Sequence, residues 1–362
     1  MNFYTALLFI ISFSFVKSNT YSQTPFVYHD AREFSIIGSG FADASGYHRL
    51  PLRYKTKVRS DVWDLSLNSA GIALRFSTNS SDIAVKWKIG NDVHFPHVAE
   101  TLVKGVDLYC RQNGKWFYAG VGKPYLKEGN QAVLIKGMDS TMKEFMLYLP
   151  MYETVDSVYI GVMSEAVIEK PGELGFKKIK PIIFYGTSIV QGASAMRPGM
   201  AYPSIISRHL NIETINFGFS GNGRMEKEMA EAMAEIDASC YVIDCGPNLK
   251  PQLAKERTVP FIRLLRQKRP TVPILLVENI IYPQRRFVKN TKQNVEGINK
   301  VFKESFATLR KEGMKNIFYL PAENLIGTDG EATVDGVHLT DLGFMRIAGV
   351  MGRKIKTILV LK

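Results

Sequence analysis

The sequence predicts an α/β protein in which an all-β, jelly-roll-like sandwich precedes a five-stranded, parallel, doubly wound domain. Two observations predict this class. Up to about residue 170, apolar and polar residues alternate over short stretches, which is typical of half-buried antiparallel strands. From about residue 180, short apolar runs are separated by longer helical stretches, which is typical of β-α units around a parallel sheet. The length of 362 residues is enough for two such domains.

Residues 1–22 are predicted to be a signal peptide. Leu7–Val16 forms an apolar core of signal-peptide length that is too short to span a bilayer. Small residues at Thr20 and Ser22 predict a mature chain that begins near Gln23. The signal peptide predicts an exported protein, periplasmic or secreted. Because no cysteine lies near the predicted cleavage point, we expect no lipid anchor and thus no stable membrane anchor.

Residues 23–175 are predicted to form the sandwich. Ile72–Ser77 and Ile83–Ile89 each alternate apolar side chains with polar or small ones. Asn113-Gly114 lies between two further apolar stretches, and this dipeptide favours a tight hairpin because both turn positions need a positive φ. Several short strands with no long helix favour two packed antiparallel sheets.

Residues 176–362 are predicted to form the parallel domain, after a linker within residues 171–180. Its apolar runs are residues 182–185, 214–217, 241–243, 274–277 and 317–320. The helical stretches are residues 201–210, 225–236, 259–268, 294–312 and 339–362. Strands that are apolar on both faces favour a flavodoxin-like sheet covered by helices on both sides, and the site of such a sheet lies at the carboxyl ends of its strands.

The formal net charge of +12 and the pI near 9.4 admit an anionic partner or a solvated basic surface. Lysine and arginine are spread along the chain in short clusters, without a nucleic-acid-binding motif. We therefore expect no nucleic-acid partner.

Polar residues that support acyl transfer gather at the predicted strand ends. Ser188 follows the first strand, and its hydroxyl becomes a nucleophile only when a histidine removes the proton. Asp335 and His338 are three residues apart, so that one turn delivers a base and the acid that orients it. The backbone N–H groups of Ser188 and Gly221, with the side-chain amide of Asn248, suit the oxyanion of a tetrahedral intermediate.

Four segments, 186–192, 216–223, 244–248 and 335–343, resemble the signature blocks of the SGNH (GDSL-like) hydrolase superfamily in order and spacing. Arg197–Met200 is similar to a segment of the branch that reads GTS in its first block, and Gly105–Tyr109 resembles the GxDLY signature of a β-sandwich domain often fused to it. The resemblance implies an SGNH hydrolase domain and an esterase that removes acetyl groups from plant polysaccharides. It implies the following roles: Ser188 as nucleophile, Ser188, Gly221 and Asn248 as oxyanion residues, His338 as base and Asp335 as its orienting acid.

Two positions depart from the family pattern. Thr187 stands where the name-giving motif has Asp, which is outside the triad, so we expect only local hydrogen bonding to differ. Pro247 precedes Asn248 and removes a backbone donor, so we expect that loop to be posed differently.

Structural alternatives exist for each site residue. Ser188 could cap a helix, Asp335 could cap the last helix, and His338 could be a satisfied buried histidine. Gly221 could be a turn glycine and Asn248 a loop former, and both are compatible with catalysis. The four blocks together favour the catalytic interpretation.

No cofactor and no metal are expected. Asp92, His94 and His97 hint at a metal site, but Pro96 interrupts the spacing, and a surface loop of the sandwich is favoured. Glu278-Asn279 ends the fourth strand, and the sequence leaves open whether this pair lines the pocket.

Three functions remain. The first is an exported serine esterase acting on short-chain, acetyl esters, with O-acetylated carbohydrate as the expected substrate. The second is a lipase or thioesterase for longer acyl chains. The third is a carbohydrate-binding protein with an inert hydrolase domain. The expected partner is an acylated small molecule or polysaccharide.

Overall fold

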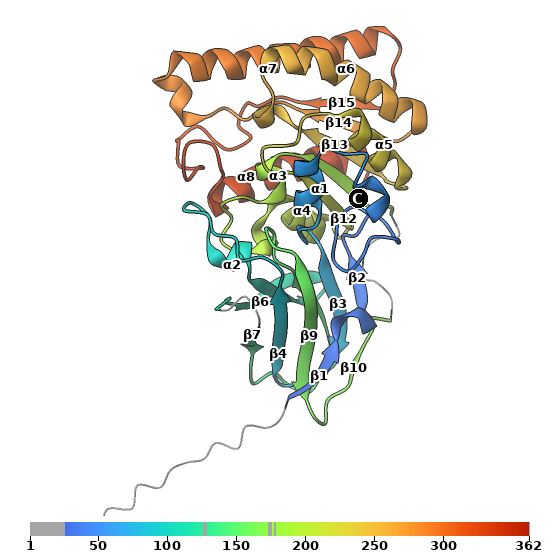
Figure 1. Ribbon diagram of the computed structural model, residues 1–362, viewed down its shortest axis with the longest axis vertical. Helices are drawn as coiled ribbons and strands as arrows, with labels where there is room; N and C mark the ends of the chain where they lie inside the picture. The colour runs from blue at the N-terminus through green and yellow to red at the C-terminus, as the bar shows by residue number, and fades with distance from the viewer. Residues whose placement is uncertain (1–25, 126–128, 173–175, 177–178, 362) are drawn as a thin grey trace, which may run out of the picture.

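The computed structural model describes residues 26–125, 129–172, 176 and 179–361. The predicted signal peptide, and part of the predicted linker, lie outside the described residues. The molecule is elongated, with antiparallel strands at one end and a parallel sheet surrounded by helices at the other (Figure 1).

The N-terminal region contains two antiparallel sheets. One has the order β1-β9-β4-β7 and the other the order β10-β3-β8-β5-β6, with β2 paired to β3. Their bounds are β1 Phe26–Asp30, β2 Ser35–Ile37, β3 Ala73–Thr78, β4 Ile83–Ile89, β5 Val106–Gln112, β6 Lys115–Gly122, β7 Asn130–Ile135, β8 Lys143–Tyr148, β9 Val155–Met163 and β10 Ile168–Glu169. Side chains from both sheets, among them Phe76, Trp87 and Phe145, form one buried core. The predicted β-sandwich is therefore confirmed.

The tight hairpin predicted at Asn113-Gly114 joins β5 to β6. The φ angles are 50° for Asn113 and 76° for Gly114, and Gln112 pairs with Lys115 across the turn. Both turn residues thus occupy the left-handed region that this dipeptide tolerates.

Strand β3 differs from the expected half-buried pattern, because all six of its residues are buried. Arg75, on the face expected to be solvated, forms an ion pair with Glu144. Its guanidinium lies over the rings of Trp116 and Phe176, at 5.1 and 4.5 Å from their centroids. An arginine paired and covered in this way can occupy a buried position that the sequence pattern marks as polar.

The C-terminal region is the predicted five-stranded parallel sheet, with the order β12-β11-β13-β14-β15. This is the 2-1-3-4-5 order of the flavodoxin-like fold. The strands are β11 Ile182–Gly186, β12 Thr214–Gly218, β13 Cys240–Asp244, β14 Ile274–Val277 and β15 Ile317–Leu320. The helices of this region are α3 Ser188–Gln191, α4 Tyr202–Leu210, α5 Lys227–Glu235, α6 Pro251–Lys268, α7 Lys289–Lys311 and α8 Asp341–Ile358.

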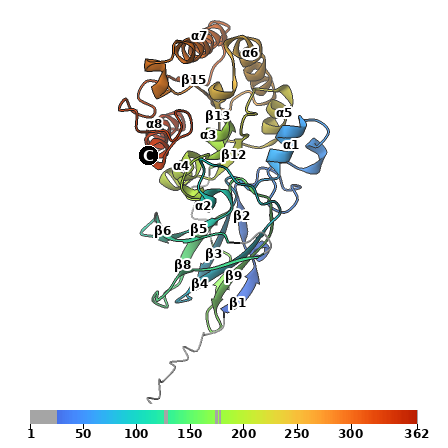
Figure 2. The ribbon, with the colours of Figure 1, turned by 60° about the vertical axis from the view of Figure 1, so that its left-hand side comes forward.

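Helices cover both faces of the parallel sheet. Residues of α4 and α8 share one buried cluster with one set of strand side chains, and residues of α5, α6 and α7 share another with the opposite set (Figure 2). Helix α6 begins eight residues before the expected start at residue 259. It continues through Pro260, and Pro251 occupies its first turn, where a proline costs no hydrogen bond.

The two regions share buried surface. Helix α1 (Ser60–Ser66) and the segment before it pack against the parallel sheet, where Phe41 stacks on Phe217 with ring centroids 6.2 Å apart. Helix α2 (Glu100–Val103) places Leu102 and Val103 in the same cluster as residues of α3. None of the helices in the described part of the chain is both long and apolar enough to cross a bilayer.

Candidate active site

Ser188 begins helix α3 directly after the first parallel strand. The helix is capped by Thr187, whose Oγ1 accepts a hydrogen bond from the backbone N–H of Ile189 at 3.2 Å. Thr187, the departure from the family motif, therefore supplies the cap that we had considered for Ser188. The hydroxyl of Ser188 remains available for another partner.

That partner is His338. Ser188 Oγ lies 3.0 Å from His338 Nε2, and His338 Nδ1 lies 2.7 Å from Asp335 Oδ2. Asp335 Oδ1 also accepts from the backbone N–H groups of Val337 and His338. The cap of α8 is Thr340, not Asp335. The structure thus joins three separately predicted residues into one chain of hydrogen bonds.

The charge of Asp335 is stabilised by this arrangement. Partial burial by itself would raise the pKa of Asp335, but the hydrogen bonds from His338 and Val337 lower it to about 2. The carboxylate is therefore ionised at every ordinary pH. An ionised acceptor at Nδ1 keeps the proton of a neutral imidazole on Nδ1 and leaves Nε2 as the acceptor facing Ser188.

Gly221 and Asn248 lie on neighbouring loops at the same end of the sheet. Gly221 has a φ of +71°. The backbone N–H of Gly223 donates to Asn248 Oδ1 at 3.0 Å, and that of Ser220 donates to Gln191 Oε1 at 3.0 Å. The side-chain oxygen of Asn248 is thus occupied, which fixes the amide and leaves its Nδ2 group to donate elsewhere.

Three donors have no partner among the described residues: the backbone N–H groups of Ser188 and Gly221, and Asn248 Nδ2. Pro247, the second departure from the family pattern, lies directly before Asn248. It stands in the first turn of the short 3-10 helix η4 (Gly246–Asn248), where its missing N–H would have no helical partner.

A buried acid lies at the end of β13, beside the strand that leads to Ser188. Asp244 is 3% exposed, and Tyr202 donates its hydroxyl to Asp244 Oδ2 at 2.9 Å. Burial raises the pKa of Asp244 to about 6, against the opposing effect of that hydrogen bond. Asp244 was not among the predicted site residues.

Contacts with neighbouring residues fix the positions of Glu278 and Asn279. Glu278 accepts from the hydroxyl of Tyr319 and from the backbone N–H of Ala322. Asn279 is fully buried, and its Cβ lies where a side chain on Gly246 would have to fit. A cavity of about 510 Å³ opens beyond β14 and β15, and neither residue is among those that line it.

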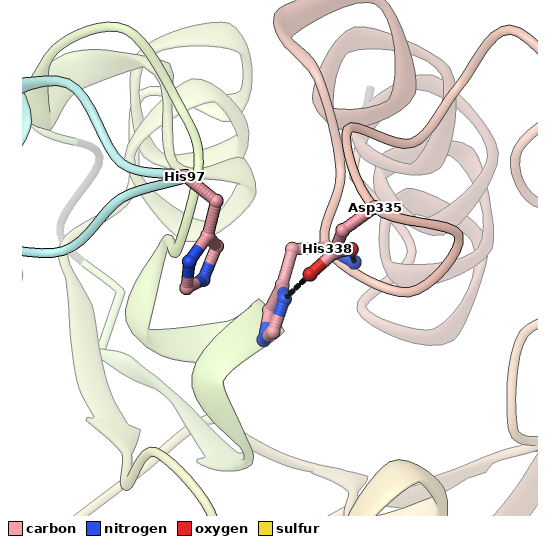
Figure 3. A group of neighbouring side chains, drawn as sticks. All are labelled: His97, Asp335 and His338. Carbon is pink, nitrogen blue, oxygen red and sulfur yellow. Dashed lines mark hydrogen bonds and ion pairs between the residues drawn. The ribbon is translucent and has the colours of Figure 1, made fainter.

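The imidazole of His97 packs against that of His338. This contact was not predicted from the sequence. The ring centroids are 4.9 Å apart and the planes are tilted by 33° (Figure 3). His97 belongs to the loop between β4 and α2 and was expected on a surface loop of the sandwich. No local pattern signals this position, since it depends on how the two regions pack.

His97, Asp335 and His338 also form a possible metal-binding group, whose ligand atoms all lie within 4.8 Å of one another. Asp335 and His338 are already bonded to each other, and a metal on His338 Nε2 would take the nitrogen that faces Ser188. Asp92 and His94 are bound elsewhere, to Lys104 and, for His94, to Glu100.

Known proteins share both regions of the chain. Residues 179–356 match the GDSL-like lipase/acylhydrolase family, and residues 26–168 match the N-terminal domain of SGNH hydrolase-type esterases. A crystal structure of a putative GDSL-like lipase from Bacteroides ovatus is 40% identical, with a TM-score of 0.89, over 93% of this chain and 99% of that one. Among curated proteins, no sequence matches the chain significantly.

More distant structures share the fold alone. A salicylyl-acyltransferase from a tetracycline biosynthetic pathway is 17% identical, with a TM-score of 0.75, over 93% of this chain and 98% of that one. An acetyl xylan esterase from the rumen bacterium Butyrivibrio proteoclasticus is 12% identical, with a TM-score of 0.57, over 92% and 99%.

Fold and family together define an ester-hydrolysing enzyme of the α/β class. The chain belongs to the GDSL-like lipase/acylhydrolase family and has the N-terminal GxDLY domain of SGNH-type esterases.

Proposed function

We propose that the protein is an exported serine esterase that removes acetyl groups from carbohydrate. The observation that carries the proposal is the chain of hydrogen bonds from Ser188 through His338 to Asp335. In this proposal Ser188 is the nucleophile, His338 the general base and Asp335 the acid that orients it.

The reaction takes two steps. Ser188 Oγ attacks the acetyl carbonyl carbon while His338 Nε2 accepts the hydroxyl proton, and the carbonyl oxygen becomes an oxyanion. The N–H groups of Ser188 and Gly221 and the amide of Asn248 donate to that oxyanion. Its collapse breaks the ester bond, and the departing alcohol takes the proton from His338. Water then attacks the acetyl-enzyme by the same route and releases acetate.

Two considerations support acetylated carbohydrate as the substrate. The domain pairing is that of SGNH-type esterases. Similar folds occur in the acetyl xylan esterase already described and in a family two carbohydrate esterase from Clostridium thermocellum, whose structure contains cellohexaose (13% identical, TM-score 0.57, over 80% of this chain and 93% of that one).

The test is hydrolysis of p-nitrophenyl acetate and p-nitrophenyl octanoate, followed by acetate release from acetylated xylan. We expect acetate to be preferred and Ser188→Ala to be inactive on both substrates. Ser207→Ala is the matched control, because Ser207 is also a buried helical serine but bonds only to the backbone oxygen of Ile212. An active Ser188→Ala variant would overturn the proposed nucleophile.

The octanoate arm tests the alternative of a lipase or thioesterase. The structure offers one candidate acyl pocket for that alternative: the 510 Å³ cavity is lined in part by Phe287, which is 87% exposed, and by none of the proposed site residues. A preference for octanoate, lost in Phe287→Ser, would replace the acetylesterase proposal.

Export is tested by expressing the full chain in a bacterial host. We expect the N-terminus of the mature protein to lie near Gln23, as read by N-terminal sequencing. A product that keeps residues 1–22 and stays in the cytoplasm would contradict the proposed signal peptide.

A further inference from the structure

The loop that carries His97 is fixed to the segment that follows the nucleophile helix. Ser194 donates its hydroxyl to the backbone oxygen of His97 at 3.0 Å. Thr101, four residues further along, donates to the backbone oxygen of Met196 at 2.5 Å. Val98, next to His97, is buried in the cluster that contains α3. His97 is therefore held at the site by the junction between the two regions.

The imidazole of His97 forms no hydrogen bond with the described residues. Among the described residues, neither ring nitrogen of His97 has a hydrogen-bond partner, and the side chain is half-buried. His94, on the same loop, is exposed and has its ring bonded to Glu100 and Lys104. Figure 3 shows His97 extending from its loop toward His338.

The space beside His338 is where the alcohol half of an ester lies during hydrolysis. The imidazole that takes the proton of Ser188 returns it to the departing alcohol, so the leaving oxygen must lie next to His338 Nε2. The oxyanion donors hold the acyl oxygen instead. A side chain packed against His338 thus borders the alcohol half of the ester.

We propose that His97 is a specificity-determining residue that binds the alcohol half of the substrate. A neutral imidazole offers one N–H donor and one acceptor nitrogen, which together match a hydroxyl pair such as a sugar ring presents. The N-terminal region would in this way select esters of polyhydroxylated alcohols. This inference rests on the proposed function, since it requires an ester-cleaving site at Ser188.

The experiment compares two acetate esters. EDTA is present so that no metal ion is bound by His97, Asp335 and His338. Methyl xyloside monoacetate has a leaving group with neighbouring hydroxyls, and p-nitrophenyl acetate has one without them. The measured quantity is the ratio of kcat/KM for the sugar ester to kcat/KM for the aryl ester. His97→Ala is expected to lower this ratio about tenfold, which is the size of effect that losing two neutral hydrogen bonds produces. His97→Asn, which retains a donor and an acceptor, is expected to recover part of it.

His94→Ala is the matched control and is expected to leave the ratio unchanged. If His97 only supported His338, its removal would slow both esters equally, so an unchanged ratio in His97→Ala overturns the inference. A wild type that cleaves the aryl ester but not the sugar ester would instead overturn the proposed carbohydrate function. The two failures are therefore distinguishable.

Discussion

Replacing Asn248 with alanine tests the proposed oxyanion site. The side-chain oxygen of Asn248 accepts from the backbone N–H of Gly223, so the amide is fixed, and its Nδ2 group has no partner in the described part of the chain. Asn248→Ala removes one of three donors, and the backbone donors of Ser188 and Gly221 remain. Loss of one such donor costs about 2.7–4 kcal/mol of transition-state stabilisation. At about 1.4 kcal/mol per factor of ten, we expect kcat to fall roughly 100- to 1000-fold.

The assay is steady-state hydrolysis of p-nitrophenyl acetate. KM should change little, because the oxyanion forms only as the reaction proceeds. Asn248→Asp retains an acceptor for Gly223 but has no donor, so it separates loss of the donor from loss of the loop contact. Equal or greater loss of kcat in Asn248→Asp supports the donor role. A kcat within threefold of wild type in Asn248→Ala would refute the reasoning.

Four further predictions concern carboxylates. Asp335→Asn should lower kcat by about four orders of magnitude because His338 loses the partner that selects its tautomer. In the wild type, log(kcat/KM) should rise with unit slope at acidic pH, where an imidazole base is protonated, and level off above about pH 7.5. Because the pKa of Asp335 is about 2, no second acidic limb is expected, and a slope of two near pH 4 would contradict this. Asp244, with a native pKa of about 6 against about 3.9 unfolded, stabilises the fold less as pH rises through that interval. Asp244→Asn should therefore raise the free energy of unfolding by about 3 kcal/mol at pH 8 and leave it unchanged at pH 4, as urea titrations at the two pH values would show; equal effects would exclude the titration as the cause. Asp107→Ala should lower the free energy of unfolding by about 3–5 kcal/mol, since it leaves the Arg197 guanidinium without its carboxylate partner and with only the neutral hydroxyl of Tyr109; a loss below about 1 kcal/mol in guanidinium titration would contradict a buried ion pair.

Features set by local sequence were predictable. The parallel strands, most helices and the Asn113-Gly114 hairpin follow from hydrophobic periodicity and turn preferences, which act over a few residues. The proximity of Ser188, His338 and Asp335 was predictable for a different reason. The carboxyl ends of parallel strands meet at one edge of the sheet, so the motifs that follow them converge.

Features set by packing between distant segments were not predictable. The alternation in β3 marks Arg75 as solvated, but Glu144 and the rings of Trp116 and Phe176 cover it. The loop of His97 contains no pattern that distinguishes His97 from His94. Only the packing of the N-terminal region against the segment after α3 brings one of these histidines to His338.

The two motifs that the sequence presents separately, Gly105–Tyr109 and Arg197–Met200, meet in one buried contact. Arg197 Nη1 donates to Asp107 Oδ2 at 2.6 Å and to the hydroxyl of Tyr109 at 2.5 Å. The backbone N–H of Gly199 donates to Asp107 Oδ1 at 3.0 Å. Each motif thus supplies hydrogen-bond partners for buried polar groups of the other. A change in either motif is therefore expected to destabilise both regions. The hydrogen bonds that hold the loop of His97 involve Ser194 and Met196, directly before Arg197, so that loop and the contact of the GxDLY segment belong to one junction between the two regions.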